Sequence, residues 1–597
     1  MTAIDSEGSA PSASWRRRTV VRDGVRLAVF ELGEPTGERP TVVLVHGWPD
    51  THLLWTSVAA DLASRYHVVA YDTRGYGQSD RPQGDAPYRL PELAADLFAV
   101  IDSVSPDRPV HVVAHDWGSV QTWEAVTTPG AEARIASFVS VSGPNLDHLG
   151  LWTHERLRRP TPKSLGQALS QAASSAYTVI FQLPVVPNVL FGIGLHAPVW
   201  HRFLTGIEGT DPANMTLAPT FRADAVSGLR YYRANIRERI TNPDPRSTKV
   251  PVFEVVNTRD VALRSAIFTN THKFTDRLWR KDTPTGHWLP YTNPGYLADI
   301  ATQFIESIRG DDVSPTIART RQTGEHRSLN GKLAVITGAG SGIGRETAYL
   351  FSENGAEVVL ADIDLDAAKE TAAEITATGG IAHAYTLDVA DTSAFTEFGE
   401  QITKTHGVAD VMVNNAGIGL AGHVLDATDE QIRRLVDINL MGVITGSRVF
   451  GRKMVERGLG GHIVNLASAA AFMPQQGLGG YAATKSGVLM FSESLRAELA
   501  EHRIGVSAIC PGIVDTNIVA ATAFAGVTKD TEKRLQDKMS GRYKRRGFTP
   551  DRVATAILRA INDNKAVVPV TIEAKVGYRI YRFVPGLSRR MARTKLF

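Results

Sequence analysis

The sequence predicts two consecutive α/β domains, each built on a mainly parallel sheet. The chain has 597 residues, and two large α/β domains of roughly 250 residues account for that length better than several small ones. Apolar, strand-like segments alternate with helix-like segments in both halves, as parallel sheets require. A polar, charged stretch, 309–328, separates the halves and is interpreted as an interdomain linker.

The composition narrows the class of protein further. With 43% hydrophobic and 21% charged residues, the chain is typical of a folded soluble protein. Cys510 is the only cysteine, which excludes an internal disulfide and is compatible with a reducing cytoplasm. The formal charge of +3 is too small to indicate a nucleic-acid partner. Residues 1–18 lack the apolar core of a secretory signal and are interpreted as a disordered lead-in.

The first domain is predicted over residues 19–308. Its strand-like segments include TVVLVHG, YHVVAYDTRGYG and RPVHVVAHDWG, each ending in a turn that contains glycine. From about residue 146 to residue 249 these signals give way to helical, apolar segments punctuated by proline, and the sheet pattern resumes at VPVFEVV. The pattern predicts a parallel sheet interrupted by a helical cap at about 146–249.

The segment AHDWGS predicts a sharp turn between a strand and a helix, with Asp116 at its centre. A carboxylate nucleophile suits displacement at an sp³ carbon, which gives an alkyl-enzyme ester that water must then hydrolyse. Asp260, in NTRD, is placed to orient a histidine, and His287, in TGHWLP, is placed to activate that water. The N–H groups of Trp48 and Trp117 are placed to form an oxyanion hole.

Together with HGWP and DTRGYGQSDRP, these motifs resemble the α/β-hydrolase epoxide hydrolases across residues 19–308. The resemblance implies the α/β-hydrolase fold with a helical cap, and two cap tyrosines that bind and protonate the epoxide oxygen. The best matches to those tyrosines are Tyr177 and Tyr232. Two alternatives stay open, because hydrolytic dehalogenases also use an aspartate at this turn, and the domain could be a lipid-binding module that has lost catalysis.

The second domain is predicted over residues 329–573. The segment LAVITGAGSGIGRETAYLF predicts a strand, a glycine-rich turn and a helix, as at the start of a Rossmann-type doubly wound parallel sheet. Gly338 permits the tight turn, and Gly342 and Gly344 let the backbone approach a pyrophosphate. Asp362 follows Gly338 by 24 residues and is placed to bind the adenosine ribose. Its charge would repel a 2′-phosphate, so the sequence predicts NAD rather than NADP.

Tyr481 and Lys485 lie four residues apart, on one face of a predicted helix. The ammonium is expected to lower the pKa of the tyrosine from its ordinary value of about 10. Tyr481 could then exchange a proton with the substrate oxygen while hydride moves to or from a nicotinamide. Ser468, 13 residues earlier, could hold the same oxygen by a hydrogen bond.

In order and spacing, these residues and the motifs NNAG and PGIVDT resemble the short-chain dehydrogenase/reductase family over about 245 residues. The resemblance implies that Asn439 supports a water relay, that Lys485 also binds the nicotinamide ribose, and that Asp388 and Val389 flank the adenine. No metal is expected. The predicted cofactor-binding residues are Gly338, Ser341, Gly342, Ile343, Gly344, Asp362, Asp388, Val389, Asn415, Ala416, Gly417, Tyr481, Lys485, Pro511, Gly512, Val514 and Thr516.

The predicted tail, residues 574–597, has seven basic residues and no acidic ones, interleaved with aromatic and aliphatic side chains. This composition suits peripheral contact with an anionic membrane, and a subunit contact or a solvated tail remain open as alternatives. The long uncharged run in the cap suggests an entrance for a hydrophobic, lipid-like substrate. We also expect a homo-oligomer, as the resemblance to short-chain dehydrogenases implies.

The order of the two domains resembles that of mycobacterial EphD-like proteins, in which an epoxide hydrolase-like domain precedes a short-chain dehydrogenase. This resemblance implies a bifunctional enzyme, and the single cysteine is consistent with the cytoplasmic location that we expect. The first site would convert an epoxide to a diol, and the second would interconvert an alcohol and a carbonyl with NAD. A diol is itself an alcohol, so the two sites could act in sequence.

Overall fold

The computed structural model describes residues 15–34, 39–183, 185–311, 313–516, 518 and 521–592. The chain divides into two units, residues 1–326 and 327–597, and each is described by itself. Part of the predicted lead-in, residues 1–14, and the last five residues of the predicted tail, 593–597, lie outside the described residues. The predicted end of the lead-in at residue 18 is wrong, because strand β1 already begins at Arg16.

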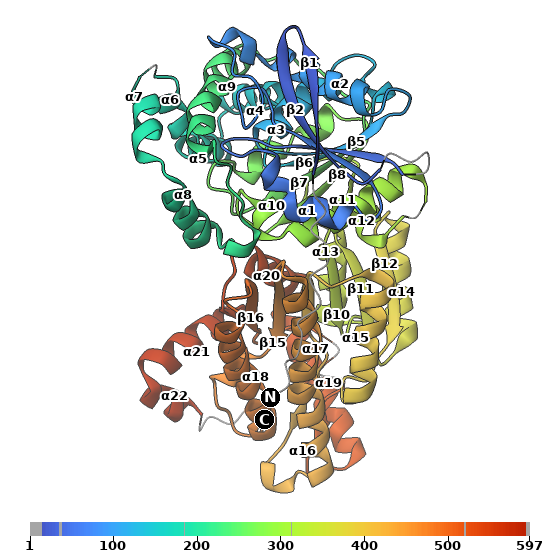
Figure 1. Ribbon diagram of the computed structural model, residues 1–597. Coiled ribbons are helices and arrows are strands. Elements are labelled where there is room, and N and C mark those ends of the chain that lie inside the picture. Colours follow the sequence, from blue (N-terminus) through green and yellow to red (C-terminus); the bar gives the residue numbers. More distant parts are fainter. Residues whose placement is uncertain are drawn as a thin grey trace, which may run out of the picture. The chain divides into compact units, whose positions relative to one another are not determined.

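A nine-stranded sheet runs through the first unit in the order β1-β2-β4-β3-β5-β6-β7-β8-β9 (Figure 1). Neighbouring strands from β4 to β8 are parallel, whereas β1, β2 and β9 pair antiparallel. The strands are β1 (Arg16–Arg22), β2 (Val25–Leu32), β3 (Thr41–Val45), β4 (His67–Tyr71), β5 (Val110–His115), β6 (Ile135–Val141), β7 (Val252–Asn257), β8 (Leu278–Thr283) and β9 (Arg321–Gln322). The central strands are buried along their whole length, as parallel strands covered on both faces are.

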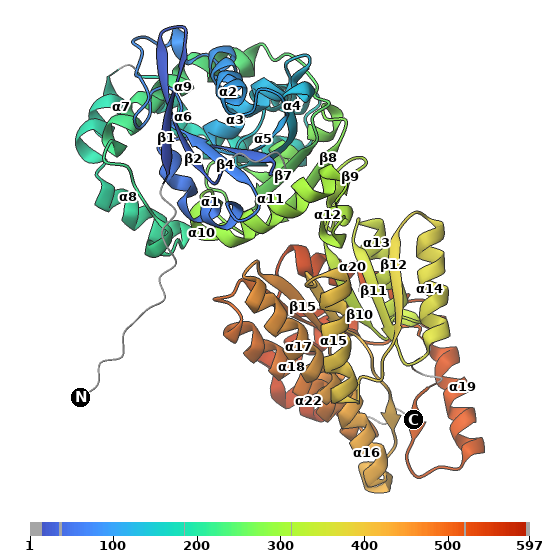
Figure 2. The ribbon, with the colours of Figure 1, turned by 45° about the vertical axis from the view of Figure 1, so that its right-hand side comes forward.

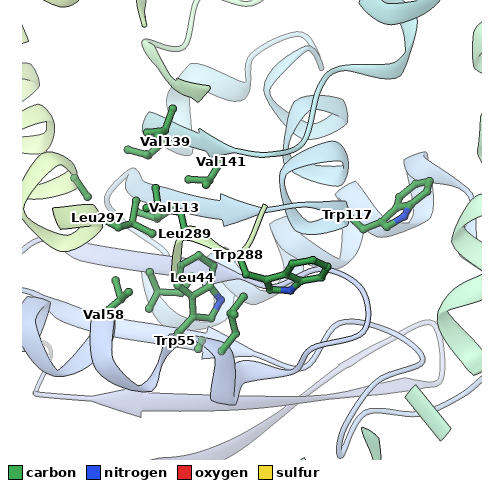
Figure 3. Close-up of a cluster of buried hydrophobic side chains, with 14 of the residues drawn as sticks. Leu44, Trp55, Val58, Val113, Trp117, Val139, Val141, Trp288, Leu289 and Leu297 are labelled. Carbon is green, nitrogen blue, oxygen red and sulfur yellow. The ribbon is translucent and has the colours of Figure 1, made fainter. Parts of the chain in front are cut away.

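Helices pack on both faces of this sheet. One face carries α1 (Thr56–Leu62), α10 (Leu289–Thr292) and α11 (Pro294–Arg309), and the other carries α2 (Leu90–Val104) and α3 (Trp117–Val126). Figure 3 shows the first of these interfaces, where Val113, Val139 and Val141 of the sheet pack near Leu297 of α11. This core supports the turns at the carboxyl ends of the strands, where Trp117 lies.

The predicted cap is confirmed as an insertion of helices between β6 and β7. Its helices are α4 (Leu146–Arg158), α5 (Pro162–Ser174), α6 (Ala176–Phe181), α7 (Val186–Val189), α8 (Ala197–Phe203) and α9 (Phe221–Thr241). An ion-pair network ties the cap to the body, because Arg239 bridges Glu124 of α3 and Asp147 of α4 at 2.9 Å each. Arg246 contacts the same two carboxylates. Pairing is what makes burial of these two acids tolerable.

The prediction of an interdomain linker at 309–328 is wrong over most of its length. Residues Pro315–Thr320 form helix α12, and β9 pairs antiparallel with β8. Ile317 is fully buried, and the guanidinium of Arg321 lies 5.4 Å from the ring centroid of Trp279. The polar composition concealed this packing, since one buried isoleucine and one stacked arginine leave no periodic pattern. The boundary between the units falls after His326.

The second unit contains a seven-stranded parallel sheet in the order β12-β11-β10-β13-β15-β16-β18. The strands are β10 (Leu333–Thr337), β11 (Glu357–Asp362), β12 (Ile381–Thr386), β13 (Val411–Asn414), β15 (Gly461–Leu466), β16 (Ile504–Cys510) and β18 (Val567–Pro569). The strand order reverses between β10 and β13, which opens a crevice at the carboxyl ends of these strands. This is the predicted Rossmann-type sheet.

Helices α13 (Gly342–Glu353), α14 (Leu365–Ala377) and α20 (Pro550–Asn562) cover one face of the second sheet. Helices α15 (Thr392–His406), α17 (Gly442–Arg457) and α18 (Gly479–Glu498) cover the other face. Beyond the carboxyl ends of the strands lie α16 (Asp429–Val436) and α19 (Lys529–Arg546), found at one end of this unit in both views (Figures 1 and 2).

The predicted boundary between domain and tail, at residue 573, is also wrong. Helix α21 (Ile572–Phe583) runs across it and is followed by α22 (Pro585–Met591). Ala574 is fully buried, and a Cβ added at Gly577 would lie 2.2 Å from the sulfur of Met473. The start of the basic segment is therefore part of the domain. Among the described residues, no helix combines the length and apolarity needed to cross a membrane.

Candidate active sites

Asp116 occupies a strained turn between β5 and α3. Its φ of 50° and ψ of −124° are rarely adopted by a residue with a side chain, and such strain concentrates at functional sites. The turn fits because its neighbours are small: a Cβ added at Gly118 would lie 2.2 Å from the carbonyl oxygen of Val45, and one at Gly143 would lie 2.3 Å from that of Asp116. The sequence motif therefore predicts the observed nucleophile elbow.

His287 lies between two carboxylates. Its Nδ1 is 2.7 Å from Asp260 Oδ2, and its Nε2 is 3.5 Å from Asp116 Oδ1. The other oxygen of Asp260 accepts hydrogen bonds from the backbone N–H groups of Ala262 and Leu263, which hold it in place. The structure thus brings together the three predicted residues, which come from three separate loops at the carboxyl ends of the strands.

Electrostatics set the protonation state of these groups. Burial lowers the pKa of His287, but the charges of Asp260 and Asp116 and their hydrogen bonds outweigh it, so the pKa lies well above its ordinary value. Burial raises the pKa of Asp260, but the imidazolium charge and three hydrogen bonds lower it by more, so the pKa lies below its ordinary value. The resting site therefore contains an imidazolium held between two acidic side chains.

The predicted oxyanion hole surrounds one oxygen of Asp116. The N–H of Trp48 donates to Asp116 Oδ2 at 2.8 Å. The backbone nitrogen of Trp117 lies beside the same small space, since a Cβ added at Gly47 would lie 2.6 Å from that nitrogen and 2.5 Å from Asp116 Oδ2. Glycine at position 47 keeps this space open for an oxygen that becomes negatively charged.

Tyr177 of α6 and Tyr232 of α9, the predicted cap tyrosines, lie near enough to Asp116 to be affected by its charge. Their side chains are hydrogen-bonded to each other, and Trp117 is hydrogen-bonded to Tyr232. Burial and the nearby charge of Asp116 raise the pKa of both tyrosines, so both hydroxyls keep their protons. The adjacent Tyr231 instead donates to the carbonyl of Arg74 at 2.7 Å, away from the site.

Aromatic side chains of the cap pack around Trp48, whose backbone N–H contacts Asp116. Their ring centroids lie 5.6 Å (Phe181), 5.6 Å (Phe191), 5.7 Å (Trp200) and 6.3 Å (Tyr232) from that of Trp48. The indole N–H of Trp48 is used internally, since it donates to the carbonyl of Ala225. These aromatic side chains suit an apolar ligand.

Sequence reasoning missed two buried acids beside the catalytic loop. Asp50 accepts hydrogen bonds from Trp288 Nε1 at 3.0 Å and Tyr291 Oη at 2.9 Å, and burial raises its pKa to about 7. Glu208 accepts from the Trp288 N–H at 3.2 Å, and burial raises its pKa. Asp50 directly follows HGWP and could have been found with that motif. Glu208 comes from the cap, and no spacing links it to His287.

A cavity of about 820 Å³ opens at the carboxyl edge of the second sheet. Every predicted cofactor-binding residue except Gly344 lines it. A Cβ added at Gly344 would lie 2.1 Å from the carbonyl oxygen of Gly338. The prediction that Gly344 approaches a pyrophosphate is therefore wrong, since its small size instead lets α13 pack against the turn.

Asp362 is held at the end of β11 with its carboxylate at the cavity. Its Oδ2 accepts from the Gly340 N–H at 2.8 Å, and its Oδ1 accepts from the Asp364 N–H at 3.0 Å. Arg345 is the cation nearest to this turn along α13, and it is already engaged by the Gly340 carbonyl and by Glu370. An acid therefore faces the position that the adenosine ribose would take.

The predicted catalytic residues of the second site lie together. Tyr481 is hydrogen-bonded to Ser468, and Lys485 Nζ donates to the carbonyl of Leu466 at 2.8 Å. Asn439 lies in the short π-helical segment η10 (Asp437–Met441), a feature common at functional sites. Its amide exchanges two hydrogen bonds with the backbone of Ile418. Ile418 lines the cavity, whereas Asn439 itself does not.

The expected lowering of the tyrosine pKa is wrong for this structure. Burial raises the pKa of Tyr481 to about 12, and the hydrogen bond from Ser468 offsets only part of that effect. Lys485 Nζ lies 5.9 Å from the ring centroid of Tyr481, and burial lowers its own pKa to about 8. Desolvation is therefore the largest effect on the pKa of each group.

Part of the cavity lining was not predicted. It is built from α16 and α19, and from β14 (Leu420–Ala421), which pairs with β17 (Ala523–Phe524). The two helices contribute mainly arginine side chains to the lining: Arg434, Met539, Arg542, Tyr543, Arg545 and Arg546. No described residue of α19 is buried, so the helix shows no apolar periodicity from which its position could be predicted.

Comparisons with known proteins agree with this architecture. The alpha/beta hydrolase fold family matches residues 40–171, and the short chain dehydrogenase family matches residues 332–524. The "Probable oxidoreductase EphD" of Mycobacterium tuberculosis is 43% identical over 586 residues, which cover 96% of this chain and 98% of that protein.

Other similar proteins match a smaller part of this chain. A sorbitol dehydrogenase of Cereibacter sphaeroides is 34% identical over 253 residues, covering 42% of this chain and 98% of its own. Among solved structures, a short chain dehydrogenase/reductase from Burkholderia phymatum in complex with NAD shares 28% identity. It covers 45% of this chain and 98% of its own, with a TM-score of 0.40.

Proposed function

The chain belongs to the EphD family, in which an α/β-hydrolase domain is joined to a short-chain dehydrogenase/reductase domain, and we propose that both domains are catalytic. The first unit hydrolyses a hydrophobic epoxide to a diol through an ester with Asp116. The second unit is an oxidoreductase domain with a nicotinamide cofactor, and we propose NAD for it.

One observation supports the proposal of epoxide hydrolysis: two cap tyrosines that keep their protons lie near enough to Asp116 for its charge to raise the pKa of both. Attack by an Asp116 oxygen forms a carbon–oxygen ester bond and breaks a carbon–oxygen bond of the oxirane. The electron pair released leaves an alkoxide, which takes a proton from Tyr177 or Tyr232. A halide leaving group needs no such proton. The Trp117 side chain, a candidate halide donor, is already engaged with Tyr232.

Ester formation also activates His287. An ester is neutral, so forming it removes one of the two carboxylate charges that hold the imidazolium protonated. The pKa of His287 then falls, so the imidazolium can give its proton to the tyrosinate left by the first step, and the neutral imidazole can take a proton from water as the water attacks the ester carbonyl. The N–H groups of Trp48 and Trp117 stabilise the resulting oxyanion. Its collapse breaks the ester bond, and His287 gives the proton taken from water to the leaving oxygen, which releases the diol. The Asp116 carboxyl group that remains then returns a proton to His287.

At the second site, Tyr481 and Ser468 hold the substrate oxygen and exchange its proton. When bound, a nicotinamide cofactor supplies the hydride acceptor or donor. Because burial raises the pKa of Tyr481 to about 12, the tyrosine in this form suits proton donation to a developing alkoxide better than proton abstraction. Lys485 is held by the Leu466 carbonyl within reach of the same cavity.

The preference for NAD follows from the carboxylate of Asp362 at the cavity. Replacing Asp362 with Ala removes a charge-assisted hydrogen bond of about 1.5–3 kcal/mol. We expect kcat/KM for NAD to fall roughly 10- to 150-fold, and kcat/KM for NADP to fall less or to rise. An equal loss with both cofactors would contradict the proposed role.

We propose a lipid-like substrate, peripheral contact with the cytoplasmic face of a membrane, and a homo-oligomer. Exposed apolar side chains on the cap and on α21 support the first two, for example Val179 at 69%, Ile572 at 78% and Phe583 at 74% exposure. Basic residues on α21 and α22 would complement anionic lipid. Flotation with anionic vesicles tests the membrane contact, and light scattering tests the oligomer.

Single-turnover hydrolysis of a long-chain epoxide in ¹⁸O water tests the first activity. We expect label in the Asp116 carboxylate of the wild type, and neither label nor turnover in Asp116→Ala. Turnover with label only in the diol would rule out the ester. Release of halide from haloalkanes, with no epoxide turnover, would identify a dehalogenase. Ligand binding without turnover in either protein would identify a binding module.

A further inference from the structure

Three metal-ligating side chains converge at the amino-terminal edge of the second sheet. His383 Nε2 lies 3.2 Å from Glu357 Oε1, and His406 Nδ1 lies 3.1 Å from the same oxygen. The three ligand atoms all lie within 4.8 Å of one another. Within the part of the chain that the structure describes, this is the one set of three such groups close enough to hold an ion.

The fold fixes these side chains from three elements. Glu357 is the first residue of β11, and β12 pairs with it in parallel so that Val359 faces His383. Side chains two residues apart on a strand share a face, so Glu357 and His383 project from the same face of the sheet. His406 is the last residue of α15, which covers that face. Figure 2 shows β11, β12 and α15 at this edge of the unit.

The geometry suits a tetrahedral ion. Zinc binds histidine nitrogen and carboxylate oxygen at about 2.0–2.2 Å, so neighbouring ligands of a tetrahedral site lie about 3.3 Å apart. The two distances to Glu357 Oε1 are close to that value. Two histidines and one carboxylate form a donor set that favours zinc among the divalent ions available to such sites.

A supporting residue orients one ligand. Tyr385 Oη lies 2.8 Å from His406 Nε2. If Nδ1 of His406 binds an ion, Nε2 keeps its proton and donates it to the tyrosine oxygen, which is the arrangement usual for metal-bound histidine. His383 is 36% exposed, so an ion has an entry path and water can occupy the fourth position.

We propose that Glu357, His383 and His406 form a binding site for a divalent transition-metal ion, with zinc as the preferred ion. The site is separate from hydride transfer, because Asp362 lies five residues further along β11, roughly 16 Å away at 3.3 Å per residue. The ion would join the edge strand β12 to β11 and to α15, and so stabilise the adenine side of the cofactor cavity. The proposal does not depend on either proposed activity.

Sequence patterns did not reveal this site, and no metal was expected from them. The two histidines follow Glu357 by 26 and 49 residues, on three different elements. No short metal-binding motif spans such distances. Only the parallel register of β11 with β12 and the end point of α15 bring the three groups together.

The test uses the full-length protein without a histidine tag, stripped with a chelator and titrated calorimetrically with Zn²⁺. We expect one ion per chain, and an absorption band typical of tetrahedral Co²⁺ when cobalt replaces zinc. His383→Gln should weaken zinc binding at least about 100-fold, and Tyr385→Phe should weaken it about 10- to 100-fold while leaving all three ligands in place. The matched control is His502→Gln, an exposed histidine of the same unit.

Thermal unfolding gives a second readout. Zinc should raise the midpoint of the second unit in the wild type and in the His502→Gln control, and should not raise it in Glu357→Gln. The proposal fails if the wild type binds no zinc, or if His383→Gln and Tyr385→Phe both bind it as tightly as the wild type. If His383→Gln does not fold, the Tyr385→Phe titration decides alone.

Discussion

Replacing Asp116 with Asn should release the proton of His287. The substitution keeps the shape of the side chain and removes its negative charge. Ester formation removes the same charge. His287 Nε2 and Asp116 Oδ1 are 3.5 Å apart and both side chains are largely buried, at 6% and 15% exposure. At an effective dielectric constant of 20, Coulomb's law gives about 5 kcal/mol of attraction between their charges. Losing it should weaken proton binding to His287 on the order of a thousandfold.

Nuclear magnetic resonance of ¹⁵N-labelled histidine side chains measures this directly. In the wild type His287 should remain an imidazolium into the alkaline range, whereas in Asp116→Asn it should become neutral at a clearly lower pH. Asp107→Asn, at an exposed acid of the same unit, is the control and should leave the titration unchanged. An unchanged titration in Asp116→Asn would show that Asp260 alone sets the charge of His287. The switch proposed for ester hydrolysis would then be wrong.

Three further predictions concern single side chains. Tyr177→Phe should slow ester formation about 100-fold in rapid-quench experiments, the low end for a lost general acid because Tyr232 remains; a rate within twofold of the wild type would exclude it as the proton donor. Gly344→Ala should destabilise the second unit by about 1–3 kcal/mol in urea unfolding, whereas Gly541→Ala, with open space around it, should not. Burial lowers the pKa of Lys485 to about 8 from 10.5, so the unfolded chain binds more protons between these values and stability should rise with pH there. Relative to Lys485→Met, the wild type should gain about 3 kcal/mol across this window, and a parallel pH dependence of the two proteins would contradict the assignment.

Short segments with strict steric requirements were predictable from the sequence. The turn at Asp116 needs a small residue at 118, because a Cβ there would lie 2.2 Å from the carbonyl oxygen of Val45. The turn after β10 likewise needs Gly338, whose φ is +64°. Such constraints are local, so the residue types that satisfy them appear as motifs. For the same reason the fold class of both units could be predicted.

Groups that act through tertiary packing were not predictable in this way. Glu208 reaches Trp288 from the cap, across 80 residues of sequence. The linker prediction failed because Ile317 is buried within an otherwise polar stretch. The pKa prediction for Tyr481 failed because spacing along a helix indicates that a lysine is near, but does not indicate how strongly both groups are desolvated.

The difference between local motifs and groups positioned by tertiary packing corresponds to the difference between the type of reaction and the choice of substrate. In the proposed reactions, the elbow, the histidine loop and the Tyr481–Lys485 pair make and break the bonds, and each is encoded within a few adjacent residues. We propose that the substrates are recognised by the aromatic cap residues around Trp48 and by the arginine-containing lining from α16 and α19. Their positions depend on long-range packing, so related chains can keep both chemistries while these surfaces change. Substitutions in these surfaces should therefore alter KM and substrate preference before they alter the chemical step.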